Sequence, residues 1–95
     1  MNFNEKCYKV LKKVLKGRVI TYKDIAKKLN TKAYRAVGRA MKANKNRKIK
    51  CYKVVCSNGK IGGFNRGIKE KIRLLRREGI EVVDGRVDKN YFFML

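Results

Sequence analysis

The stretch TYKDIAKKLNTKAYRAVGRAMKAN, residues 21–44, decides the fold because it contains two short amphipathic helices joined by a tight turn. Thr21 and Asp24 form a variant of the capping box that starts a helix. An apolar stripe follows at helical spacing, made of Ile25, Ala26 and Leu29. Together with the second segment, 33–44, this predicts a helix-turn-helix, a motif that places its second helix against DNA.

The second segment has two different sides. Its apolar side consists of Ala33, Val37, Ala40 and Met41. Its outer side is small and basic, with Ala36 and Gly38 beside Arg35, Arg39 and Lys42. Small residues allow a helix backbone to approach a duplex closely, and long cations reach phosphates or bases. The alternative is an ordinary solvated charged face beside a satisfied core.

The rest of the chain predicts further short elements. A helix over 4–17 would have Asn4 as N-cap and Gly17 as its end. A short strand from residue 51 should turn at Asn58-Gly59, and a helix should follow over 67–79 with Ile68, Ile72 and Leu75 inward. A hairpin is expected around Asp84-Gly85, with Tyr91 to Leu95 packing back. We therefore expect a mainly α, winged-helix-like small domain, residues 1–95, with a short β-hairpin near the C-terminus.

Composition restricts the partners. Lys and Arg number 27 against seven Asp and Glu, so the formal net charge is +20 over 95 residues. Nucleic acid is the expected partner of such a chain, and an anionic membrane surface or simple solubility is the alternative. The sequence has no long apolar run and no signal-like segment, so a cytoplasmic, DNA-associated protein is expected. Three cysteines without a C-x-x-C pair, and no histidine, argue against a disulfide framework or a structural zinc site, so no metal is expected.

The segment KIKCYKVVCSNGKIGGFNRG, residues 48–67, places Cys51 among lysines. Positive charge from Lys48, Lys50 and Lys53 favours the thiolate, which is the nucleophilic form of cysteine. Cys51 could instead be a small core residue, and for Cys56 that interpretation is the favoured one. The glycine-rich part lacks the residues of a phosphate-binding P-loop, so Gly63 and its neighbours are expected to give close backbone approach around a pocket.

Four motifs in this order resemble the DNA-binding and active-site domain of the 6-O-alkylguanine-DNA alkyltransferases, also called methylated-DNA-protein-cysteine methyltransferases. The motifs are GRVITYKDIAKKLN, RAVGRAMKAN, CYKVVCSNGKIGGFNRG and KIRLLRREG. The resemblance implies a monomeric repair protein that binds double-stranded DNA, extrudes an alkylated guanine and transfers the alkyl group irreversibly to its own cysteine. Such a protein acts once and needs no cofactor.

The resemblance also implies roles for individual residues. Cys51 falls on the alkyl acceptor, Tyr22 on the tyrosine that helps to rotate the nucleotide, and Arg35 on the arginine that fills the vacated place in the base stack. Asn44 and Glu78 fall on the pair that braces the active site. Phe64 stands where a tyrosine often lines the guanine pocket, and Asn65 where a serine is common.

One departure from the family pattern leaves two function classes open. The family's usual Pro-Cys-His-Arg-Val is Lys50-Cys51-Tyr52-Lys53-Val54 here, and the neutral hydroxyl of Tyr52 is a poorer base than histidine. If Cys51 reacts, Lys50 and Lys53 are expected to favour its thiolate. The alternative is a non-enzymatic alkyltransferase-like protein, similar in length, that flags lesions for other repair factors. A plain helix-turn-helix regulator is a more distant third possibility.

Overall fold

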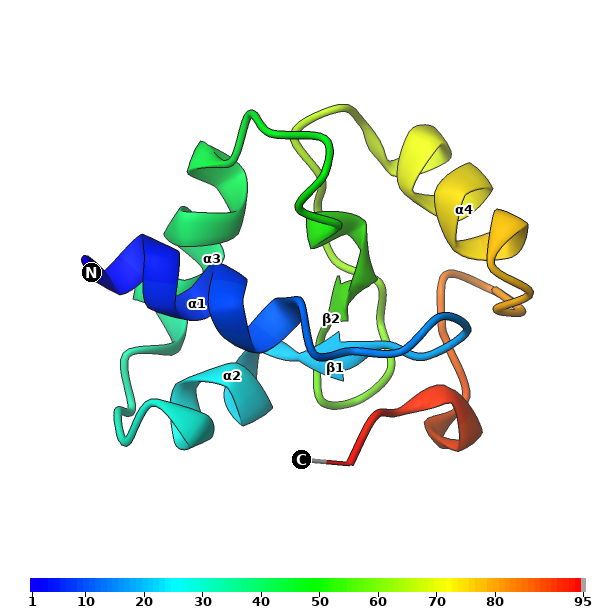
Figure 1. Cartoon of the computed structure of the whole chain (residues 1–95). Helices are drawn as coiled ribbons and strands as arrows, with labels where there is room; N and C mark the ends of the chain where they lie inside the picture. The colour runs from blue at the N-terminus through cyan, green and yellow to red at the C-terminus, as the bar shows by residue number, and fades with distance from the viewer. Residues whose placement is uncertain (95) are drawn as a thin grey trace.

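The structure is a computed structural model, and it describes residues 1–94 (Figure 1). Within these residues it has four α-helices, two 3₁₀ turns and a two-stranded sheet. In chain order the elements are α1 (Phe3–Leu11), β1 (Ile20–Thr21), α2 (Tyr22–Lys28), α3 (Tyr34–Ala43), η1 (Cys51–Lys53), β2 (Val54–Val55), α4 (Ile68–Arg77) and η2 (Lys89–Tyr91). The predicted fold class, a mainly helical small fold, is confirmed.

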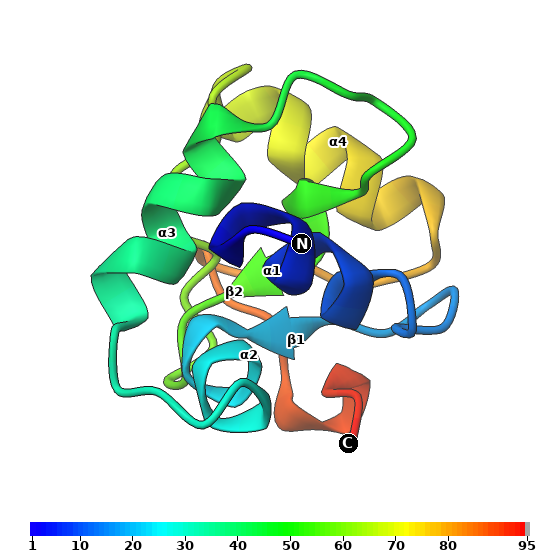
Figure 2. The ribbon, with the colours of Figure 1, turned by 60° about the vertical axis from the view of Figure 1, so that its left-hand side comes forward.

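The helix-turn-helix consists of α2 and α3, which pack against each other and against α1 (Figure 2). The predicted cap is present, since the Thr21 hydroxyl accepts a hydrogen bond of 3.0 Å from the Asp24 amide. On α3 the residues Val37, Ala40 and Met41 are buried, as predicted. Ala33 is exposed instead, because it precedes the first turn of α3.

The first helix differs from its predicted bounds of 4–17. Asn2 caps it rather than Asn4, accepting a bond of 2.8 Å from the Glu5 amide, and the helix ends at Leu11. Tight turns continue the chain, which brings Val14 into the core. The periodicity of the apolar residues persists through these turns, so it could not reveal where the regular helix stops.

A short parallel sheet joins the two halves of the fold. Ile20 of β1 pairs with Val54 of β2, and Thr21 pairs with Val55. The preceding residue, Val19, donates 2.8 Å to the Tyr91 carbonyl and accepts 2.7 Å from the Phe93 amide. Segment 19–21 therefore lies between β2 and the segment that follows η2.

Two predicted turns occur in the structure. The Asn58-Gly59 turn is closed by a bond of 2.9 Å from the Gly59 amide to the Cys56 carbonyl. At Asp84-Gly85, Val83 and Arg86 exchange two bonds of 3.0 Å, but this bridge is isolated and no strand extends from it. Tyr91, Phe92 and Phe93 are half-buried, as expected for a segment that packs back, while Leu95 lies outside the described residues.

The buried side of α4 is unusual. Leu75 is fully buried and Ile72 half-buried, as predicted, but the prediction for Ile68 is wrong because its side chain is 53% exposed. Ile68 opens the helix at the surface, and the buried position one turn later is taken by Lys71. Among residues 1–94, no helix is long and apolar enough to span a membrane.

Candidate active site

Cys51 opens η1 and lines a pocket of about 250 Å³. Its side chain is 6% exposed. The other walls come from three segments distant in sequence, namely Tyr22 of α2, residues Gly38, Met41 and Lys42 of α3, and the loop Gly63, Phe64 and Asn65. The structure thus brings the predicted thiol, tyrosine and pocket loop together around one hollow.

Asn44 fixes the approach of the chain to Cys51. Its amide nitrogen lies 3.4 Å from the Cys51 sulfur and donates to the Ile49 carbonyl at 3.0 Å. Asn65 in turn donates 2.9 Å to the Asn44 carbonyl. The side-chain amides of Asn44 and Asn65 therefore hold the segment between α3 and η1 in a closed loop. The Cys51 sulfur lies at the end of this loop.

Two aromatic residues give the pocket its apolar surface. Tyr22 is half-buried, and burial raises the pKa of its hydroxyl to about 12, so the hydroxyl remains a proton donor at neutral pH. Phe64 is half-buried beneath the Arg66 guanidinium, whose carbon lies 5.0 Å from the ring centre. An aromatic pocket of this kind suits a planar base.

The loop of residues 63–65, called the pocket loop, is held in place by Lys71, which the sequence analysis did not single out. The ammonium of this fully buried residue donates to the carbonyls of Val54, Ile61 and Gly63, with distances of 2.8 Å to Val54 and 3.1 Å to Gly63. Three N–H groups meet three carbonyls, which uses every donor that a lysine has. Burial lowers the pKa of Lys71 to about 8. The lysine ties β2 to the loop that forms one pocket wall.

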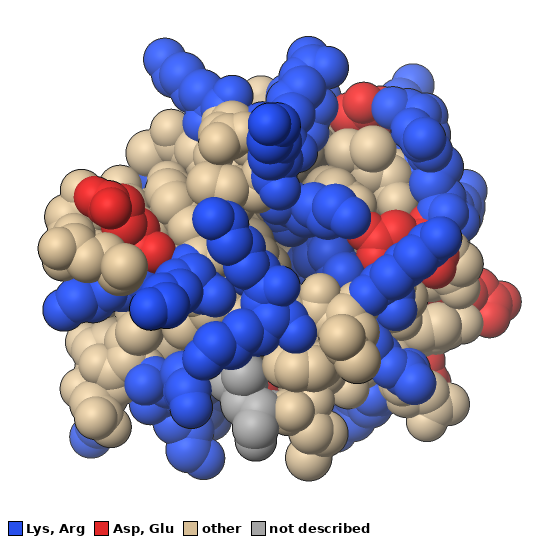
Figure 3. Space-filling view, in the orientation of Figure 1, with Lys and Arg blue, Asp and Glu red and all other residues tan. Residues whose placement is uncertain are grey.

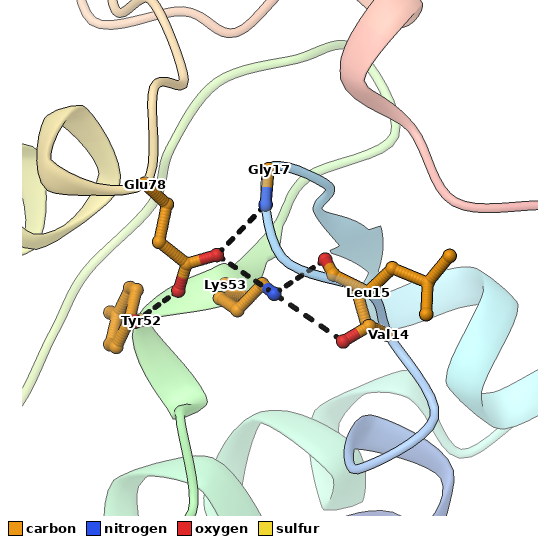
Figure 4. A network of polar contacts seen from close by, with 6 residues as sticks. All are labelled: Val14, Leu15, Gly17, Tyr52, Lys53 and Glu78. Carbon is orange, nitrogen blue, oxygen red and sulfur yellow. Dashed lines mark hydrogen bonds and ion pairs between the residues drawn. The ribbon is translucent and has the colours of Figure 1, made fainter.

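Tyr52 and Lys53, the last two residues of η1, meet Glu78 (Figure 4). The Tyr52 hydroxyl donates to one oxygen of Glu78, while the Lys53 ammonium lies 3.0 Å from the other. The Gly17 amide adds a third donor at 3.0 Å. Lys53 also donates to the Leu15 carbonyl at 2.8 Å. The carboxylate therefore has three donors, Tyr52 on one oxygen and Lys53 and Gly17 on the other.

The pKa shifts in this network follow from burial and from the bonds to Glu78. Burial alone would raise the pKa of Glu78, but the bonds from Tyr52, Gly17 and Lys53 together hold it below its ordinary value. Burial, and then the bond to Glu78, raise the pKa of Tyr52. Burial lowers the pKa of Lys53 although Glu78 opposes the shift.

This geometry changes the expected source of positive charge beside the Cys51 thiol. Lys53 is 2% exposed and paired with Glu78, so it does not supply the free positive charge predicted beside Cys51. Lys48 and Lys50 remain exposed. The Tyr52 hydroxyl is likewise engaged with Glu78 rather than with the sulfur.

The predicted DNA-facing residues lie on the outer side of α3. Arg35, Arg39 and Lys42 are exposed there, and Ala36 and Gly38 are half-buried between them. A side chain added at Gly38 would meet nothing within 4 Å, so the backbone is open to approach at this point. Lys42 also lines the Cys51 pocket, which places the helix surface and the pocket side by side.

A family model described as the DNA-binding domain of 6-O-methylguanine DNA methyltransferase matches residues 2–80. A curated relative from Picrophilus torridus, a bifunctional methyltransferase/endonuclease, is 46% identical over 89 residues, which is 90% of this chain and 30% of that protein. A methylated-DNA-protein-cysteine methyltransferase from Methanocaldococcus jannaschii is 40% identical over 94% of this chain and 53% of its own. The chain spans about half, or less, of the length of these relatives.

Solved structures of related proteins have similar folds. The O6-methylguanine-DNA methyltransferase from Pyrococcus kodakaraensis superposes with a TM-score of 0.76 and 48% identity, covering 84% of this chain and 47% of that one. Atl1 from S. pombe, in complex with damaged DNA containing O6-carboxymethylguanine, gives a TM-score of 0.83 and 26% identity. That match covers 98% of this chain and 95% of Atl1.

Proposed function

We propose a function from the premise that the chain belongs to the 6-O-methylguanine DNA methyltransferase family, whose DNA-binding domain matches residues 2–80. The chain binds double-stranded DNA as a monomer, with residues 1–95 acting as one alkyltransferase-type domain. It extrudes a 6-O-alkylguanine and transfers the alkyl group to Cys51. The observation that carries this proposal is the position of the Cys51 sulfur, held by Asn44 in the wall of an aromatic pocket next to α3.

Extrusion is needed because the reacting carbon is otherwise enclosed in the base stack. Arg35 takes the place of the extruded base, and Tyr22 assists the rotation of the nucleotide. Arg39 and Lys42 bind phosphates, and Ala36 and Gly38 admit the duplex backbone. Gly63, Phe64 and Asn65 receive the guanine in the pocket that they line with Cys51.

In the transfer step the sulfur of the Cys51 thiolate forms a bond to the alkyl carbon. The bond between that carbon and the guanine oxygen breaks, and its electron pair stays on the guanine. The guanine then takes up one proton, equivalent to the one that the thiol released, and is restored to its unmodified form. The product on the protein is a thioether, so each molecule reacts once.

A lesion-binding protein without transfer is the second candidate, because of the geometry around Tyr52. Its hydroxyl donates to Glu78, and Lys53 is paired with the same carboxylate. Neither group can therefore readily take the thiol proton. The similar fold of Atl1, solved in complex with damaged DNA containing O6-carboxymethylguanine, supports lesion binding as well. We expect transfer to be slower than with a histidine at position 52, and to become faster as pH rises above neutrality.

Intact mass after incubation with a duplex containing 6-O-methylguanine separates the two candidates. The wild-type protein should gain one methyl group, Cys51→Ala should gain none, and Cys56→Ala should react normally. Tyr52→His should increase the rate near neutral pH. A protein that prefers the lesion-bearing duplex but never gains mass would be a lesion-binding protein, and the transfer proposal would be abandoned.

A further inference from the structure

A basic groove of about 340 Å³ adjoins η1 at Tyr52, whereas the pocket adjoins η1 at Cys51. Five cations line it, namely Lys16, Arg47, Lys50, Arg66 and Arg77. They come from the segment after α1, the link before η1, the loop before α4 and the end of α4. The face that includes the end of α1 carries far more Lys and Arg than Asp and Glu (Figure 3).

The groove's positive charge is only partly balanced by the protein. Its one carboxylate, Glu78, is already bound by Lys53, Tyr52 and Gly17. The two side-chain ion pairs found within residues 1–94 are Lys53–Glu78 and Arg73–Glu70, and neither includes a groove cation. Gathering five like charges is unfavourable unless an anion accompanies them. Three of the five are arginines, which bind phosphate in a bidentate manner.

The groove connects to the candidate active site without being part of it. It shares Arg47 and Arg66 with a second hollow of about 350 Å³. That hollow shares Lys42, Cys51 and Asn65 with the pocket. The groove and the pocket have no lining residue in common, and the adjacent residues Cys51 and Tyr52 line one each. The pocket, the second hollow and the groove therefore adjoin one another, and together they form a basic path from the Cys51 thiol to the end of α4.

We propose that this path binds a single-stranded DNA segment that extends from a duplex held on α3. The inference rests on the proposed DNA binding. A duplex is stiff over about 150 base pairs, so it cannot turn from α3 into the groove within a protein whose longest extent is 34 Å. A single strand is flexible, and basic grooves of this kind hold its backbone.

The test compares the affinity for a blunt duplex containing 6-O-methylguanine with that for the same duplex carrying a single-stranded tail of roughly 8 nucleotides, within the range that one binding domain holds. The tail should increase affinity about tenfold at 50 mM salt, and the increase should shrink steeply by 200 mM. The variant Lys16→Gln/Lys50→Gln/Arg77→Gln alters side chains that line the groove but neither of the other hollows. This variant should lose most of the affinity that the tail adds. The plot of log affinity against log salt for the tailed duplex has a negative slope, and the magnitude of that slope should decrease by about 2.

A matched control, Lys60→Gln/Lys69→Gln/Lys89→Gln, removes the same charge from exposed positions outside the groove and should retain the tail's contribution. If the tail adds no affinity, or if both triple variants lose it equally, the inference is overturned. Equal losses on blunt and tailed duplexes in the groove variant would assign the groove to duplex binding and also overturn it. The proposed function is judged separately: preference for the blunt lesion-bearing duplex over the unmodified one tests lesion binding, and the gain of one methyl group in intact mass tests transfer to Cys51.

Discussion

Among residues 1–94 two lysines are buried, and they are held in different ways. Lys53 is 2% exposed and pairs with the Glu78 carboxylate at 3.0 Å. Lys71 is fully buried, and its donors go to three backbone carbonyls. The charge of Lys53 is therefore neutralised by a partner, whereas that of Lys71 meets dipoles only. Burial lowers the pKa of both lysines, but Glu78 opposes the shift only for Lys53, and the pKa of Lys71 falls to about 8.

The difference shows what each lysine does for the fold. The Lys53–Glu78 ion pair joins η1 to the end of α4, and the Lys53 ammonium also donates to the turn after α1. Each buried charge of the pair is stabilised by the other. Lys71 instead connects β2 to the pocket loop at the expense of burying a charge. A buried charge without a counter-charge is unfavourable for folding. The loop that Lys71 holds in place forms one wall of the candidate active-site pocket.

The largest expected effect comes from breaking the ion pair. Glu78→Gln leaves Lys53 buried without a counter-charge and should lower the free energy of unfolding by about 3–5 kcal/mol. Urea denaturation measures this loss. Replacing both charges, in Lys53→Met/Glu78→Gln, should recover much of it, since a neutral pair leaves no buried charge unpaired. A double variant as unstable as the single one would show that the charge is not the cause.

The next effect is the pH dependence that Lys71 confers. Its pKa is about 8 in the folded state against an ordinary lysine value of 10.5, so the unfolded chain binds the proton more tightly. Below pH 8 both states are protonated and the full cost of burying the charge is present. Between pH 8 and 10.5 the folded state gives up its proton first, so stability rises with pH. The contribution should reach about 2–3 kcal/mol by about pH 10.

Other titrating groups act in the same range, so the measurement is a difference. Urea denaturation at about pH 7 and about pH 10 is compared between wild type and Lys71→Met, which lacks the buried amine. The wild type should gain more stability over this interval than the variant. Parallel curves for the two proteins would mean that the ammonium of Lys71 is not destabilised in the folded state.

The smallest expected effect is that of Lys71→Met on stability at neutral pH. Removing the uncompensated charge is favourable, while three carbonyls lose their donor at about 1 kcal/mol each, so the net change should stay below about 2 kcal/mol. The loop should nevertheless loosen, and hydrogen exchange of the amides over 61–64 should become faster. Lys69→Met, at an exposed position on the same helix, serves as control and should change neither quantity. A loss as large as that of Glu78→Gln would contradict the distinction between the two lysines.

The local signals in the sequence predicted much of the fold. The Thr21 cap and the Asn58-Gly59 turn depend on neighbouring residues, and both are present as expected. Lys71 was missed because a lysine is rarely fully buried, although its place four residues before Leu75 puts it on the apolar side of α4. A short strand was predicted from residue 51, and β2 lies in that stretch, after η1. The strand β1 and its pairing with β2 were not predicted, since each strand has two residues and no alternation can be read from them.

The direction of the side chains in η1 also required the structure. Lys53 was expected near the thiol because it is two residues from Cys51. In a 3₁₀ turn successive side chains point about 120° apart. Tyr52 and Lys53 can therefore face Glu78 while Cys51 faces the pocket. Nearness in sequence does not establish which side of so short an element a residue faces.

The three residues 19–21 connect parts of the chain that are far apart in sequence. Ile20 and Thr21 pair with residues 54 and 55, and Val19 is bonded to Tyr91 and Phe93. Each pairing requires a long loop to close before any favourable contact is gained. Helical bundles fold quickly because most of their contacts are local in sequence. Segment 19–21 instead forms its contacts with two segments that are distant in sequence. The protein should accordingly fold more slowly than its helix content suggests, and this segment should be completed late.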